Sequence, residues 1–90
     1  VQAAPDHLDL DRVRSRLLSI EGVQNIHDLH VWTLTSDMEV ASVHLMTPVD
    51  ADSHIILDQA TTMLQEEFNI AHATLQVEPD THERCVETSW

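Results

Sequence analysis

Lysine is absent from this 90-residue sequence, and four arginines are its only permanently basic side chains. Against them stand 16 acidic residues, which give a formal net charge of −12. Nucleic acids and anionic membrane surfaces bind basic patches, so we expect neither as a direct partner. The acidic surface attracts metal cations, although the same charge would also serve simply to keep a small domain soluble.

Glycine and cysteine occur once each, and no apolar run approaches the ~20 residues of a transmembrane helix. One glycine excludes a glycine-rich phosphate loop. One cysteine, Cys85, excludes an intrachain disulfide framework and the cysteine pair of a free-standing metallochaperone. There is no nucleophile elbow, so we expect no enzyme activity. We also expect no signal peptide at the start.

The length fits one domain, which we place at residues 1–79, followed by a flexible polar tail at residues 80–90. Apolar residues recur with helical spacing in two stretches, and shorter stretches rich in β-branched residues alternate as strands do. Asp9 or Asp6 can cap the first helix, Glu21-Gly22 can end it, and Asn69 is a plausible C-cap of the second. The expected elements are a helix from about Leu8 to Ile20, a strand in the second half of Val23–Thr35, a turn at Thr35–Met38, a strand at Glu39–Met46, a helix from Ser53 to about Phe68 and a strand at Ala73–Glu78.

This order predicts an α+β fold of the type αββαβ, with a three-stranded mixed sheet and both helices on one face. Alternation in the second strand directs Ala41, Val43 and Leu45 toward the helices and His44 toward the other face. That face would be left uncovered. A two-fold homodimer is the simplest way to cover it.

Seven histidines accompany the many carboxylates, and this mixture of ligands suits Zn²⁺. In His27-x-x-His30 the two side chains should face apart, because residues three apart on a regular strand point to opposite faces. His27 and His44 lie on adjacent strands. A simple hairpin would place His44 nearer His30 or Val31, so His27 and His44 meet only across a bulge or if His27 precedes the strand proper.

The runs IHDLHVWTLTSD, VASVHL and AHATLQVE resemble the cytoplasmic C-terminal domain of cation diffusion facilitator transporters, most closely the cobalt-zinc-cadmium resistance type. The resemblance covers Leu8 to Pro79. It implies a metallochaperone-like (ferredoxin-like) αββαβ domain that follows a transmembrane region of a cell membrane protein and lies in the cytoplasm. It further implies a V-shaped homodimer that binds Zn²⁺, with Co²⁺ and Cd²⁺ as alternatives, and regulates proton-coupled efflux.

Candidate metal ligands follow from the resemblance position by position. His27 and His44 match metal-ligating positions, Glu78 falls where family members carry a carboxylate ligand, and His54 matches a histidine ligand of some members. Gln76 stands where certain members have histidine, which puts a binuclear site in doubt, and His72 is near enough to compensate. Asp28 is a candidate partner for the second nitrogen of a ligating imidazole.

Two alternatives stay open. The domain could be a dimerisation module with no metal-sensing role, in which the histidines are ordinary surface residues. His82 and Cys85, in the tail sequence HERC, could form a second, mobile binding site or belong simply to a loose tail.

Overall fold

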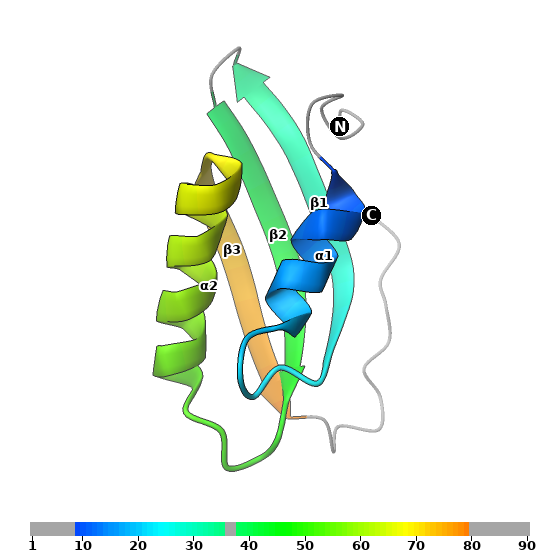
Figure 1. The fold of residues 1–90 in the computed structure, drawn as a ribbon, viewed down its shortest axis with the longest axis vertical. Coiled ribbons are helices and arrows are strands. Elements are labelled where there is room, and N and C mark those ends of the chain that lie inside the picture. The colour runs from blue at the N-terminus through cyan, green and yellow to red at the C-terminus, as the bar shows by residue number, and fades with distance from the viewer. Residues whose placement is uncertain (1–8, 36–37, 80–90) are drawn as a thin grey trace.

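Five elements follow one another along the chain in a computed structural model that describes residues 9–35 and 38–79 (Figure 1). Their order is helix, strand, strand, helix, strand, which confirms the expected αββαβ arrangement. Residues 36–37, at the centre of the turn expected at Thr35–Met38, and residues 80–90, with His82 and Cys85, lie outside the described residues. The elements are α1 (Leu10–Leu18), β1 (Asn25–Thr35), β2 (Met38–Thr47), α2 (Ser53–Phe68) and β3 (Ile70–Pro79).

Aspartates cap both helices, because a carboxylate can accept hydrogen bonds from the unpaired N–H groups of a first turn. Asp9 Oδ1 accepts from the backbone of Asp11 and Arg12, and Asp52 Oδ1 accepts from the backbone of His54 and Ile55. The second helix spans the residues expected, and it ends at Asn69 in the left-handed conformation, with φ 56°. These capping residues determine where the helices start and where α2 ends before β3.

The first helix is shorter than expected, and the sequence-based C-cap at Glu21-Gly22 is wrong. The helix ends at Leu18 with Ser19 as its C-cap, because the Ser19 N–H already bonds to carbonyls of the last turn. Gly22 instead occupies the turn that follows, with φ +96°, a conformation that favours glycine. A Cβ at this position would lie 3.0 Å from Cδ1 of Ile56, so the glycine also allows α2 to approach the turn.

The three strands form one sheet in the order β1-β2-β3, with β1 antiparallel and β3 parallel to the central β2. The sheet is therefore mixed, as expected. β1 starts at Asn25 and β3 at Ile70, so β3 begins three residues earlier than its alternation indicated. The helix α2 provides the crossover that a parallel strand pair requires.

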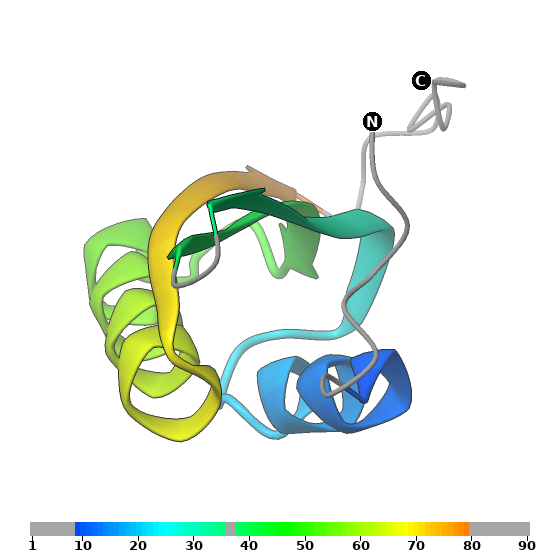
Figure 2. The same ribbon diagram turned by 90° about the horizontal axis from the view of Figure 1, so that it is seen from above.

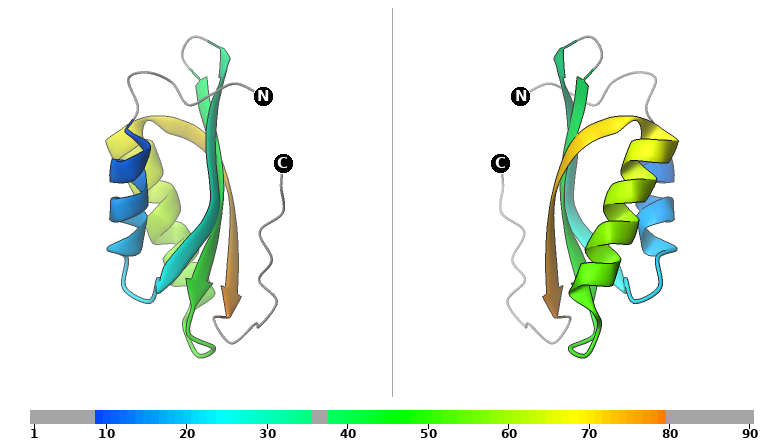
Figure 3. Two further views of the ribbon diagram at one scale, coloured as in Figure 1. Left: turned by 90° about the vertical axis from the view of Figure 1, so that its right-hand side faces the viewer. Right: turned by 90° about the vertical axis from the view of Figure 1, so that its left-hand side faces the viewer.

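Both helices cover the same face of the sheet (Figures 2 and 3). Ala41, Val43 and Leu45 of β2 are at most 1% exposed and form the floor of the core, as their alternation predicted. Val13 and Leu17 of α1 and Ala60 and Leu64 of α2 pack onto them from above. The other face, which we call the open face, is not covered by any helix or strand of the described residues.

One ion pair ties the two helices together. The guanidinium of Arg16 in α1 donates to both carboxylate oxygens of Glu67 in α2, at 2.8 and 2.7 Å. Hydrogen bonding to Arg16 lowers the pKa of the Glu67 carboxyl, and the same contact raises the pKa of Arg16. The pair is partly exposed, so it orients the helices more than it stabilises the fold.

Candidate metal centre

A β-bulge in β1 determines which histidines meet. His27 lies directly opposite His44, whereas His30 lies opposite Ser42. Two residues of β1 therefore face a single residue of β2, and the extra one is accommodated by Asp28 in the left-handed region at φ 55°. Aspartate tolerates this conformation better than most residues do. The irregular register that a His27–His44 pair requires is thus present.

The bulge overturns the expectation that His27 and His30 face apart. Residues directly opposite each other in an antiparallel pair point to the same face of the sheet. Ser42 and His44 share a face because they are two residues apart on a strand of regular register, so their partners His30 and His27 share it too. The extra bulge residue shifts the alternation of β1 by one position, which brings all three histidines to the open face.

His44 and Glu78 already contact each other. The Nδ1 atom of His44 lies 3.3 Å from Oε2 of Glu78, and each side chain is about one fifth exposed, at 21% and 19%. Glu78 comes from β3, which runs beside β2 in parallel register. His44 therefore stands between His27 on one neighbouring strand and Glu78 on the other.

Two imidazoles and a carboxylate are a donor set that suits Zn²⁺ and leaves one tetrahedral position open. Opposed residues of an antiparallel pair have Cβ atoms roughly 4.5–5.5 Å apart, so side-chain rotation alone could direct both imidazoles at one ion. Within residues 9–35 and 38–79, no three His, Cys, Asp or Glu side chains already stand in a group that would hold a metal. The ligand types fit the ion, and closing the site requires side chains to turn toward one point.

The other predicted ligands lie farther away. His72 of β3 is paired with Val40, four residues along β2 from His44, which corresponds to about 13 Å. His54 is an exposed residue in the first turn of α2, in the helical layer behind the sheet. Gln76 is the direct neighbour of His44 on β3. The structure thus places His27 and Glu78 on the strands that flank His44, whereas His54 and His72 lie farther from His44.

A small cavity adjoins His44 on the open face, and sequence reasoning did not find it. Its volume is about 70 Å³, and it is bounded by residues of all three strands. Two buried oxygen atoms, Oδ2 of Asp28 and Oγ of Ser42, have no hydrogen-bond partner among the described residues. The lining residues are Asp28, Ser42, Val43, His44, Thr74 and Gln76.

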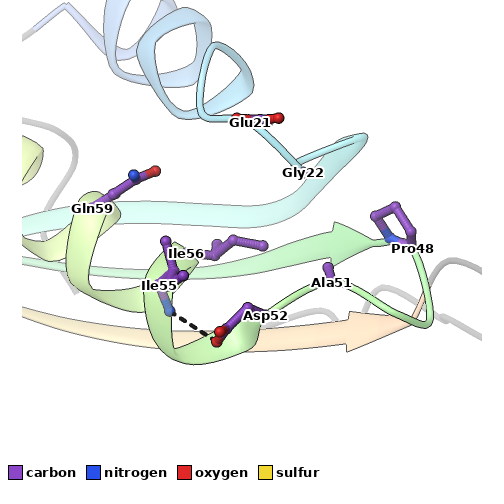
Figure 4. Close-up of a pocket in the computed structure, with 8 residues that line it drawn as sticks. All are labelled: Glu21, Gly22, Pro48, Ala51, Asp52, Ile55, Ile56 and Gln59. Atoms are coloured by element: carbon purple, nitrogen blue, oxygen red, sulfur yellow. Dashed lines mark hydrogen bonds between the residues drawn. The ribbon is translucent and has the colours of Figure 1, made fainter.

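A larger hollow of about 310 Å³ lies elsewhere, between the turn after α1 and the start of α2 (Figure 4). Its two carboxylates are Glu21 and Asp52, and Asp52 is already engaged in capping α2. Its remaining walls include Ile55, Ile56 and Pro48, and it contains no histidine. The larger hollow therefore has no imidazole, whereas the smaller one is bounded by one imidazole, His44, and one carboxylate, Asp28.

Comparison with known proteins finds a family model and relatives that are all described as cation transporters. Residues 5–80 match the family model described as "Cation efflux protein, cytoplasmic domain". The chain is 42% identical over 78 residues to the probable proton-coupled zinc antiporter SLC30A3 of Rattus norvegicus, covering 87% of this chain and 20% of the relative. It is 37% identical to the human proton-coupled zinc antiporter SLC30A2, covering 87% of this chain and 21% of the relative.

Among solved structures, the metal-bound C-terminal domain of the CzcD transporter from Cuprividus metallidurans has the same fold. The TM-score is 0.74 at 35% identity, covering 79% of this chain and 99% of that domain. The chain spans about a fifth of the length of the curated relatives it matches. None of the helices in the described part of the chain is both long and apolar enough to cross a membrane.

Proposed function

The chain belongs to the cation efflux protein family, to its cytoplasmic domain, and we propose that it is a metal-binding regulatory and dimerisation domain of a divalent-cation efflux transporter. The metal is Zn²⁺, with Co²⁺ and Cd²⁺ as alternatives. Its ligands are His27, His44 and Glu78. Proton-coupled efflux across the cell membrane would be performed by the rest of the transporter, which lies outside this chain.

The observation that carries the proposal is the bulge at Asp28, which pairs His27 with His44 beside Glu78. In a regular hairpin these two imidazoles would be out of register. A bulge disrupts the strand ladder locally and requires an unusual backbone conformation. The bulge in β1 lies where it pairs two histidines on the open face. A bulge in this position is typical of a binding site.

Dimerisation follows from the open face. A sheet with helices on one side leaves its other side to a partner, and a second copy of the chain is the partner of matching shape. Each copy also carries a strong negative charge, which opposes association. A cation bound at the open face neutralises part of that charge. Metal therefore binds better to the closed dimer, in which the two copies lie close together, than to the dimer in which they lie farther apart.

The regulatory step is linkage between metal binding and closure. A ligand shifts an equilibrium between two states only by the difference in its affinity for them. A tenfold preference for the closed dimer contributes about 1.4 kcal/mol per site. With two copies, and so two sites, the contribution doubles.

Isothermal titration calorimetry with Zn²⁺, combined with small-angle scattering, tests the proposal. We expect the wild-type chain to bind Zn²⁺ and the dimer to become more compact, and both effects to be lost in His27→Ala and His44→Ala. The alternative is a dimerisation module without metal sensing. A wild-type dimer that neither binds Zn²⁺ nor changes its scattering profile would establish that alternative and reject ours.

A further inference from the structure

Two buried oxygen atoms line the small cavity beside His44. Oδ2 of Asp28 and Oγ of Ser42 are both shielded from solvent and make no hydrogen bond among the described residues, and Ser42 as a whole is only 7% exposed. Buried polar groups are almost always paired, since an unpaired one has lost its bonds to water and gained nothing in return. A buried carboxylate oxygen is the costlier of the two, because it carries charge. We therefore expect the cavity to hold a ligand that interacts with these two side-chain oxygen atoms.

The lining indicates what kind of ligand this is. Asp28 contributes a carboxylate, Ser42 and Thr74 contribute hydroxyls, and Gln76 contributes an amide. Neither arginine nor lysine occurs among the six lining residues, so the cavity wall holds no permanent positive charge that would neutralise Asp28. The volume of about 70 Å³ accommodates a single ion with a water molecule. Charge and size together favour a cation.

The position of the cavity connects it to the proposed metal centre. His44 is one of its walls, and the same imidazole contacts Glu78 of β3. Asp28 is the bulge residue itself, so the backbone irregularity that aligns His27 with His44 also sets the carboxylate against the cavity. A β1 strand without the bulge would lack the extra residue that contributes this carboxylate.

We infer that Asp28 is a direct ligand of a divalent metal ion shared with His44, in the cavity formed by Ser42, Thr74 and Gln76. This inference rests on the proposed function and extends it. The centre then has two imidazoles and two carboxylates, so its charge balances that of one divalent cation. The hydroxyl and amide oxygens hold water bound to the ion.

The test compares Asp28→Asn with Asp58→Asn in the whole chain. Asparagine also tolerates the left-handed conformation, so the bulge is retained while the carboxylate is lost. Asp58 is an exposed residue of α2 and provides the matched change in charge. The measurements are Zn²⁺ affinity by calorimetry, the visible absorption spectrum of bound Co²⁺, and the melting temperature without metal.

For Asp28→Asn we expect Zn²⁺ affinity to fall at least tenfold, the Co²⁺ spectrum to change, and the metal-free melting temperature to rise because an unpaired buried charge is gone. Asp58→Asn should leave affinity and spectrum as in wild type. An unchanged affinity and spectrum in Asp28→Asn would overturn the inference, and so would a lower metal-free melting temperature, which indicates a purely structural role. Failure of the wild-type chain to bind Zn²⁺ would instead reject the proposed function.

Discussion

Replacing His44 with alanine should remove the metal response almost completely, because His44 is the middle member of the proposed site. His27 comes from β1 and Glu78 from β3, on either side of β2. Neighbouring strands are about 4.8 Å apart, so the two remaining ligands are anchored roughly 10 Å from each other. Neither can replace the missing imidazole, and we expect the affinity for Zn²⁺ to fall by about 100-fold.

The size of the effect follows from mass action. Free Zn²⁺ at 100 times the dissociation constant stabilises a folded protein by about 2.7 kcal/mol. For a domain of this length that corresponds to an increase in melting temperature of roughly 10–20 °C. With the affinity reduced by about 100-fold, the same Zn²⁺ concentration contributes only about 0.4 kcal/mol, or roughly 2–3 °C.

Differential scanning calorimetry at fixed free Zn²⁺ measures both shifts, each relative to the same variant without metal. His54→Ala is the matched control, because it removes an exposed imidazole from the helical layer and should keep the wild-type shift. A His44→Ala variant that melts with the full wild-type shift would refute the reasoning. So would a His54→Ala variant that loses the shift, since the metal would then bind on the helical side.

Three further predictions concern the scaffold. Leu64→Ala, at a core position only 1% exposed, should lower the free energy of unfolding by about 2–5 kcal/mol in chemical denaturation. Gly22→Ala should lower it by about 1 kcal/mol or more, because alanine is strained at φ +96° and its Cβ would press on Ile56. Arg16→Gln should lower the melting temperature at neutral pH, where the Glu67 carboxylate is charged. Since its pKa is lowered in the fold, this difference from wild type should vanish as the pH falls through that lowered value, and a pH-independent difference would contradict the ion-pair assignment.

Much of the fold could be predicted from the sequence, because its signals are local. The amphipathic spacing of residues 53–68, with Asn69 after it, predicts a helix without any tertiary contact. The alternation of Ala41, Val43 and Leu45 likewise identified the core face of β2. The end of the first helix was missed, because the glycine that marked it serves a turn packed against Ile56, and that contact is made across the fold.

The site was less predictable, since its geometry depends on one residue with no sequence signature. A bulge with a glycine in the left-handed position can be suspected from sequence, but here the residue is Asp28. Strand alternation therefore predicted that His27 and His30 would face apart, and that prediction was wrong. The sequence indicates that His27 and His44 pair only across a bulge or if His27 precedes the strand proper, and the register shows a bulge. The oxygen-lined cavity could not be anticipated, because Ser42, Thr74 and Gln76 come from two strands that meet only in the folded sheet.

Anomalous scattering at the zinc absorption edge, from crystals grown with Zn²⁺, tests the central claim most directly. The account predicts an anomalous peak on the open face of the sheet, within about 2.0–2.2 Å of an imidazole nitrogen of His27, one of His44, and a carboxylate oxygen of Glu78. A peak on the helical side at His54, or no peak at any of these three residues, would contradict it.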